Sequence, residues 1–169
     1  LFLIPNDINT GGISGLAMIL RELLGSVGEN VWIEPDFRCE FGKNITIGEN
    51  VYINFGCVIL DCAEVTIGAN ALLGPNIGIY PVNHALDAEE RIHGGCQGKP
   101  VRIGKNVWLG GDVKIVAGVT IGDGAVIGAG SVVTRDVPPG VAAVGNPCRV
   151  VRKITESDRI GYEPPRGKD

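Results

Sequence analysis

The 169-residue chain is poor in aromatic side chains, which make up only 5% of its residues. Its interior must therefore be built from small and branched aliphatic side chains, and this suits thin stacked coils better than a bulky β-sandwich. A surplus of basic residues is also lacking, because the formal net charge is −4. Non-specific binding of nucleic acid requires a basic field, so we expect no nucleic-acid partner.

The chain also lacks the cysteine spacing of a disulfide framework or a zinc site. Its cysteines are odd in number and include no Cys-x-x-Cys pair: Cys39, Cys57, Cys62, Cys96 and Cys148. This pattern predicts a protein of the reducing cytoplasm.

No long uninterrupted hydrophobic run is present. Residues 1–20 are apolar at both ends but are broken by Pro5, by asparagine and aspartate residues, and by Gly11 and Gly12. A membrane-spanning helix needs about 20 mainly apolar residues, so we expect no membrane partner. The first basic residue is Arg21, so the opening stretch also lacks the charged start of a secretory signal.

What the chain does contain is a period of six residues. Between residues 103 and 137 an aliphatic residue occupies every sixth position: Ile103, Leu109, Ile115, Ile121, Ile127 and Val133. Four positions after each comes a small or branched residue: Val107, Val113, Val119, Ala125, Ser131 and Val137. A period of six fits neither a helix nor an unbroken strand alternation. It predicts a β-solenoid, in which a short strand and a tight corner repeat and each aliphatic side chain stacks on its copy in the next coil.

Glycine and asparagine recur where the corners are expected. Glycine follows the aliphatic residue at four positions, Gly104, Gly110, Gly122 and Gly128, and Asn106 and Gly124 stand two positions further on. We expect these residues to supply the positive φ angles of the corners. Turns of an ordinary β-sandwich would instead recur every 8 to 12 residues or so.

The period extends backwards to residue 31, with two-residue offsets that we expect to fall at corners. The inward positions there are Ile33, Ile47, Ile53, Ile59, Ile67, Leu73 and Ile79. The period then stops over a polar, glycine-rich stretch that holds both histidines, His84 and His93. A loop of this length is expected to carry a functional site.

These features divide the chain into three parts. We expect an N-terminal segment over 1–30 with a short helix from Leu16 to Leu24, a solenoid over 31–147 that ejects the loop 80–102, and a C-terminal tail over 148–169.

From about Leu20 to Ile154 the chain resembles the hexapeptide-repeat O-acetyltransferases of the maltose, galactoside and nodulation-factor type. The matching strings are LLGSVGENVWIEPDFRCEFGKNITIGEN, NFGCVILDCAEVTIG, NHALDAEER, KNVWLGG, GVTIGDGAVIGAGSVVTRDVPP and GNPCRVVRKI. The resemblance implies an all-β solenoid of the left-handed parallel β-helix type, although right-handed crossovers are the general rule. It further implies acetyl-CoA as co-substrate, no required metal, and a homotrimer with each active site in the cleft between two neighbouring prisms.

The resemblance assigns the acceptor side of the site to four residues. His84 matches the catalytic base, although the His-Pro of the family is here His84-Ala85. A sugar hydroxyl must lose its proton as it attacks the thioester, and an imidazole can accept that proton near neutral pH. Asn54 matches an asparagine that hydrogen-bonds near the base, and its alternative role is to form a corner. Tyr52 and Asp61 match positions that line the same pocket, but a second acid that galactoside-type enzymes carry after Asp61 is absent.

The coenzyme side is assigned in the same way. Trp108 matches a tryptophan beside the pantetheine arm, and Gly111, Ala129 and Thr134 match positions along which that arm runs. An N–H group of the glycine pair that ends at Gly111 would be free to stabilise the oxyanion of acyl transfer. The alternative for Trp108 is packing on the flank of the solenoid.

Two arginines of the tail complete the expected coenzyme site. Arg149 and Arg152 match residues near the nucleotide phosphates, where a guanidinium group suits phosphate oxygens. The alternative for both is a solvated basic end of the chain.

The sequence thus predicts an acetyl-CoA-dependent O-acetyltransferase that acts on a hydroxyl of a sugar or a similar small acceptor, by direct attack. Residues 1–18 match the family poorly where its helical segment supplies an acid and an arginine to the acceptor pocket. A non-catalytic scaffold therefore stays open, as does an amine or antibiotic acceptor. A zinc lyase of the γ-carbonic-anhydrase kind would need three histidine ligands, and the chain has two histidines.

Overall fold

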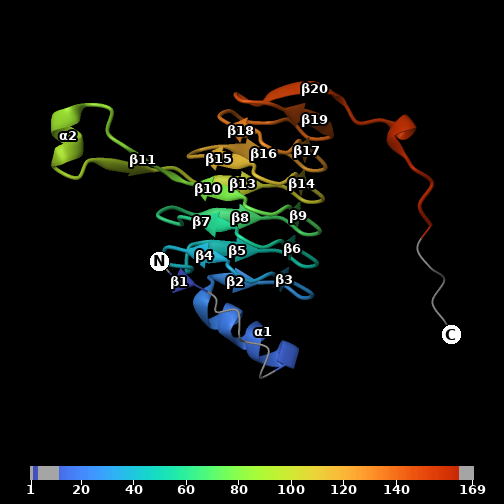
Figure 1. Ribbon diagram of the computed structural model, residues 1–169, viewed down its shortest axis with the longest axis horizontal. Helices are drawn as coiled ribbons and strands as arrows, with labels where there is room; N and C mark the ends of the chain where they lie inside the picture. Colours follow the sequence, from blue (N-terminus) through green and yellow to red (C-terminus); the bar gives the residue numbers. More distant parts are fainter. Residues whose placement is uncertain (1, 4–11, 164–169) are drawn as a thin grey trace.

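The computed structural model describes residues 2–3 and 12–163, and it shows a three-sided β-solenoid (Figure 1). Sheet A contains, in spatial order, β1 (Phe2–Leu3), β4 (Arg38–Cys39), β7 (Val58–Ile59), β10 (Gly78–Tyr80), β15 (Lys114–Val116) and β18 (Val132–Val133). Sheet B contains β16 (Thr120–Ile121), β13 (Val101–Ile103), β8 (Val65–Ile67), β5 (Ile45–Ile47) and β2 (Ser26–Val27). Sheet C contains β20 (Arg149–Lys153), β19 (Val141–Val144), β17 (Val126–Ile127), β14 (Trp108–Leu109), β9 (Leu72–Leu73), β6 (Tyr52–Ile53) and β3 (Trp32–Ile33).

Each complete coil takes one strand from sheets B, C and A in turn. Neighbouring coils pair in parallel and in register, as in Ile45↔Val65 and Ile53↔Leu73. The described chain forms five complete coils and the start of a sixth, because sheet B holds five strands.

The core lies along the axis of the prism. Every inward position predicted from the period of six is at most 6% exposed, including the polar Ser131. Ser131 is satisfied there, since its hydroxyl donates to the Gly128 carbonyl and accepts from the Gly145 N–H. The predicted aliphatic core is therefore confirmed.

The corners need glycine or asparagine for two different reasons, and the sequence analysis predicted only one of them. Asn106 and Gly124 have φ angles of 56° and 65°, as expected for corner residues. The glycines directly after the aliphatic residues do not have positive φ angles, so that part of the prediction is wrong. They are needed because coils meet closely: a Cβ on Gly104 would lie 2.7 Å from the Asp123 backbone nitrogen, and one on Gly110 would lie 2.6 Å from that of Ala129.

The two-residue offsets fall at the corner between sheets A and B, as expected. In the lower coils this corner takes five residues, 40–44 and 60–64, whereas higher in the prism it takes three, 117–119. The same corner between β10 and β13 is expanded into an arm of about twenty residues.

The arm is an ordered structure that leaves the prism on one side (Figure 1). It consists of an antiparallel ribbon of β11 (Val82–His84) and β12 (Cys96–Gly98), with α2 (Ala88–Ile92) at its tip. Asp87 caps this helix by accepting hydrogen bonds from two backbone N–H groups, and the Arg91 guanidinium donates to the carbonyls of Ala85 and Leu86.

Both ends of the solenoid carry other structure. Helix α1 spans Gly12–Leu23, so it begins four residues before the expected helix, and the coils begin at Ser26 rather than at residue 31. Strand β1 pairs antiparallel with β4 at the lower end of sheet A, and β20 pairs antiparallel with β19 at the upper end of sheet C. Residues 4–11 of the expected N-terminal segment lie outside the described residues. Within the described ranges, no helix is long and apolar enough to cross a membrane.

Candidate active site

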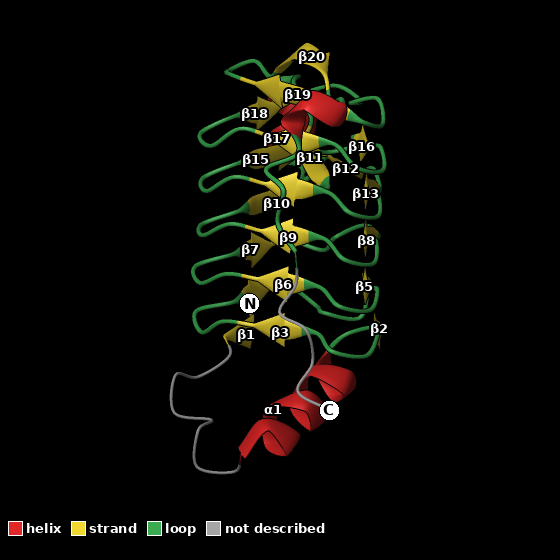
Figure 2. Cartoon of the chain, turned by 90° about the vertical axis from the view of Figure 1, so that its right-hand side faces the viewer, coloured by secondary structure: helices red, strands yellow, loops and turns green. Residues whose placement is uncertain are grey.

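The strands of sheet C are stacked one above another along one side of the prism (Figure 2), and each coil adds one side chain to a column on the outer face of this sheet. Strand register places these residues directly above one another from the N-terminal end upwards: Trp32, Tyr52, Leu72, Trp108, Val126 and Ala142. Arg152 of β20 lies opposite Ala142 and continues the column. The two strands that hold Tyr52 and Trp108 are separated only by β9, so this column joins residues expected for the acceptor and for the coenzyme. Trp108 is 54% exposed, so it is available to a ligand.

A second line of predicted residues runs along the corner between sheets C and A. Asn54 follows β6 at this corner, Gly111 follows β14 and Ala129 follows β17. The coils meet closely here, because a Cβ on Gly74 would lie 2.7 Å from the Gly111 nitrogen. The Asn54 side chain accepts a hydrogen bond from the Phe55 N–H at 2.8 Å, which is the corner-forming role considered from the sequence.

Tyr52 is part of a polar cluster that the sequence analysis missed. The Trp32 indole N–H and the Tyr52 hydroxyl both donate to Oε1 of Glu34, at 2.9 and 3.2 Å. Partial burial and the hydrogen bond to the Glu34 carboxylate raise the pKa of Tyr52 above its usual value. A signal was present, since Trp32 and Tyr52 are 20 residues apart, which is the length of one lower coil.

His84 lies on the arm, far from sheet C. In Figure 1 the arm projects on one side of the prism, and β3, β6, β9 and β14 lie on the other. His84 ends β11 and pairs across the ribbon with Cys96, and both line an open hollow of about 700 Å³ together with Ala85, Leu86 and Glu90. The imidazole is exposed, as a proton acceptor for an incoming substrate must be. His93, by contrast, is held at the end of α2, where its Nδ1 lies 2.8 Å from the Glu89 carbonyl.

The Asp61 side chain is enclosed by the backbone of the neighbouring coil and does not line a pocket. It is fully buried, and its carboxylate accepts hydrogen bonds from the backbone N–H groups of Glu40, Phe41 and Asn44 at 2.9 to 3.2 Å. It therefore provides hydrogen-bond acceptors for the backbone N–H groups of the five-residue corner 40–44 in the coil below. A further bond from the Asn44 amide to the Asp61 carbonyl, at 2.7 Å, joins the same two corners.

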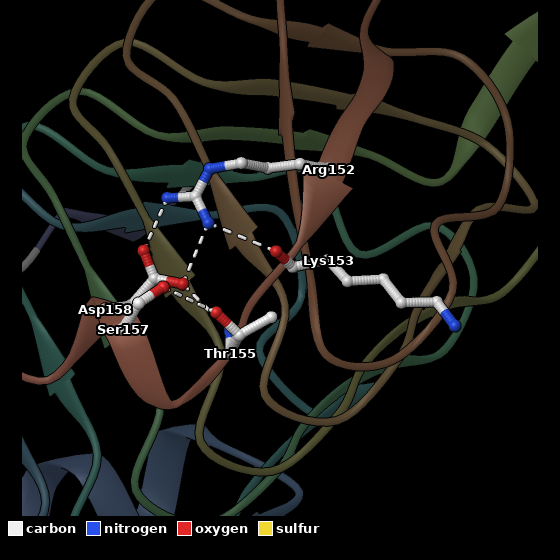
Figure 3. A network of polar contacts seen from close by, with 5 residues as sticks. All are labelled: Arg152, Lys153, Thr155, Ser157 and Asp158. Atoms are coloured by element: carbon white, nitrogen blue, oxygen red, sulfur yellow. Dashed lines mark hydrogen bonds and ion pairs between the residues drawn. The ribbon is translucent and has the colours of Figure 1, made fainter.

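Within the C-terminal tail, Asp158 binds Arg152, one of the two predicted phosphate ligands (Figure 3). Its guanidinium forms a bidentate pair with Asp158, with N–O distances of 2.6 and 2.8 Å. The Thr155 N–H donates to the same carboxylate at 2.8 Å. The hydrogen bond from Arg152, together with that from Thr155, lowers the pKa of Asp158 to about 2. Arg149 is exposed and donates to the Cys148 carbonyl, so it has no acidic partner among the described residues.

One chain thus divides the predicted residues between two sides of the prism. Sheet C and its corner with sheet A collect Tyr52, Asn54, Trp108, Gly111, Ala129, Arg149 and Arg152. The corner between sheets A and B carries His84 on its arm, Thr134 directly after β18, and the buried Asp61. His84 and Trp108 therefore do not come together within one chain.

Comparison with known proteins gives consistent results. Residues 100–135 match the family model described as bacterial transferase hexapeptide, six repeats. The galactoside O-acetyltransferase of Escherichia coli is 47% identical over 144 residues, which cover 85% of this chain and 71% of that protein.

Two solved structures share the fold. A maltose O-acetyltransferase from Clostridium difficile has a TM-score of 0.86 and 50% identity, covering 89% of this chain and 81% of that one. A galactoside acetyltransferase in complex with coenzyme A has a TM-score of 0.87 and 41% identity, covering 97% and 82%. The shared fold is the left-handed parallel β-helix, which confirms the handedness implied by the sequence resemblance.

Proposed function

Because this chain belongs to the family of hexapeptide-repeat acetyltransferases, and is an acetyl-CoA-dependent acyltransferase of the galactoside and maltose O-acetyltransferase type, we propose that it acetylates a hydroxyl of a sugar with His84 as general base. The observation that carries the proposal is the position of His84. It is exposed at the end of β11, on an arm held by backbone pairing and a capped helix, beside an open hollow. A base held on such a frame is positioned for a substrate that enters from solvent.

The proposed reaction is a direct transfer. The His84 imidazole removes the proton from the sugar hydroxyl as its oxygen attacks the carbonyl carbon of the thioester. The backbone N–H of Gly111 stabilises the oxyanion of the tetrahedral intermediate, because the Gly110 N–H already donates to the Ile127 carbonyl. The C–S bond then breaks, and the proton held by His84 passes to the sulfur of coenzyme A.

The coenzyme lies along sheet C in this proposal. Its nucleotide end lies near Arg149 and Arg152, and its pantetheine arm descends past Ala129 and Trp108 towards Tyr52 and Asn54. The order of strands in sheet C, from β20 down to β6, supports this direction.

The assembly proposed is a homotrimer, with each site between two copies. The division of the site residues between two sides of one prism supports this arrangement, since β11, which ends at His84, and β14, which begins at Trp108, lie on opposite sides of a single chain. In the trimer the arm of one copy would bring its His84 to sheet C of the next.

The test is acetyl-CoA turnover, followed as release of free thiol with maltose, glucose, galactosides and amino sugars as acceptors. We expect His84→Ala to lower kcat by roughly 10² to 10⁴, the usual contribution of a general base. His93→Ala is the matched control and should retain activity. Equal activity of the His84 variant and the unmodified chain would contradict the assignment.

A further inference from the structure

The column on sheet C begins with Trp32, which the proposed transfer does not use. Here Trp32, Glu34 and Tyr52 form the hydrogen-bonded group described above, which we name the Trp32 cluster. The Trp32 side chain is 46% exposed and Glu34 is half-buried, so the cluster is accessible from the outer face of the sheet. Both donors reach Oε1 of Glu34, and within the described chain no hydrogen bond engages Oε2.

The chemistry of the cluster matches one face of a sugar ring. An exposed indole offers a flat apolar surface that can cover the C–H face of a pyranose. The unoccupied carboxylate oxygen beside it can accept charge-assisted hydrogen bonds from ring hydroxyls. The indole N–H and the Tyr52 hydroxyl hold the carboxylate in place, so its orientation is fixed before a ligand arrives.

The position of the cluster also indicates which part of an acceptor would reach it. In the proposed function the coenzyme occupies the coils above Asn54, from β14 to β20. The rest of an acceptor must then extend the opposite way, towards β3. Trp32 lies one coil below Tyr52, a step of about 4.8 Å, which is comparable to the step from one ring to the next in a glycoside.

We propose that the Trp32 cluster binds the second ring of the acceptor, so that the preferred acceptor is a disaccharide or longer glycoside rather than a single sugar. The inference rests on the proposed function for the place of the first ring, next to Tyr52 and Asn54. Trp32 stacks on the second ring, and Glu34 accepts hydrogen bonds from its hydroxyls.

The kinetic test compares maltose with glucose in the complete protein. Trp32→Ala is expected to raise KM for maltose roughly fivefold to tenfold, the worth of one aromatic stacking contact. The KM values for glucose and for acetyl-CoA should stay unchanged, because neither molecule reaches the first coil. Phe41→Ala removes a comparably exposed aromatic side chain of the first coil outside the cluster and serves as control. Equal changes for maltose and glucose, or no change for either, would overturn the proposal.

A binding measurement separates this inference from the proposed function. The chain has two tryptophans, so Trp108→Phe leaves Trp32 as the sole indole fluorophore. We expect maltose to change its emission in a saturable way, and Glu34→Gln in this background to weaken binding roughly tenfold. Saturable binding to this variant, with no turnover by the unmodified chain, would reject the transferase assignment alone, and no saturable change would reject the sugar subsite. If Trp32→Ala instead alters the oligomeric state in sedimentation, the cluster is a contact between copies and the subsite is rejected.

Discussion

At the scale of single residues, burial separates structural carboxylates from those that can meet a ligand. Asp61 and Glu34 are both acids of the lower coils, but Asp61 is fully buried under three backbone N–H groups and Glu34 is partly open. The sequence resemblance placed Asp61 in the acceptor pocket and did not distinguish Glu34. The deciding contacts join residues 17 to 21 positions apart, so they become visible only when the coils are stacked.

Asp61→Asn should therefore reduce stability rather than sugar binding. The amide offers one acceptor oxygen where the carboxylate offers two, and its NH₂ group would face backbone donors. Leaving buried donors unsatisfied costs about 1–3 kcal/mol, to be measured by urea unfolding. Glu64→Gln, an exposed change at the same corner, is the control and should be neutral. Normal stability together with a raised KM for the sugar would instead restore Asp61 to the pocket.

At the scale of elements, the distance from a corner to the next coil determines which corner positions require glycine. Gly104 and Gly124 are both corner glycines between sheets B and C, but they stand at different positions of the corner. The structure explains the two glycines differently. Gly104 is needed because the backbone of the next coil lies too close for a Cβ, whereas Gly124 is needed because its φ angle is 65°, with open space around it. The spacing of glycines predicted the corners, but the local sequence does not reveal which glycine faces a backbone atom 19 residues away.

Alanine at these two glycines should accordingly have different costs. Gly124→Ala places a Cβ in the left-handed region and should cost about 1–2 kcal/mol. Gly104→Ala has no such backbone penalty, but it forces the backbone of Asp123 to move and should lower Tm further, which calorimetry of the two variants would measure. The opposite order would contradict the steric explanation.

The tail is a second element whose contacts have a consequence for function. Asp158 occupies the guanidinium of Arg152, which we propose to lie near the coenzyme phosphates. Asp158→Ala should therefore lower KM for acetyl-CoA by roughly twofold to fivefold, the worth of an exposed ion pair. Arg152→Ala should raise it, and steady-state kinetics at a fixed acceptor concentration would measure both. If both variants leave KM unchanged, Arg152 does not contact the coenzyme.

The same pair has a defined dependence on pH. The pKa of Asp158 in the folded chain is about 2, below the usual value for aspartate. Its contribution to docking of the tail is therefore complete above about pH 4 and is lost as pH falls through 2. The carboxyl carbon shift of Asp158, followed by NMR, should titrate near pH 2, and in Arg152→Ala it should titrate nearer the ordinary value.

At the scale of the whole molecule, the period of six predicted most of the fold because it is a local signal repeated many times. The core needed only this period, as the burial of Ile103 to Val133 at every sixth position shows. The site was less predictable, since the resemblance supplied the residues but not their distribution in space. Only the stacked structure places His84 and Trp108 on opposite sides of one prism.

This separation leads to a prediction about mixed assemblies. Chains with His84→Ala and chains with Trp108→Ala should each be inactive alone, but copies unfolded and refolded together should recover activity. With random assembly, about one site in four would combine an intact arm with an intact sheet C. Turnover of the refolded mixture, compared with each variant refolded alone, measures this. Failure to recover any activity would indicate that both residues act within one chain.

The antiparallel strands at the two ends have a consequence for how long such a structure can grow. Parallel coils present the same backbone groups above and below, which is also how chains add to a cross-β fibril. Strand β20 ends sheet C, and β1 ends sheet A, with the chain direction reversed. A second molecule arriving end-on at either sheet therefore meets a strand that runs the wrong way to continue the winding. The reversed terminal strands thus oppose end-to-end polymerisation through sheets A and C, although the interior of the prism is stacked as in a cross-β fibril.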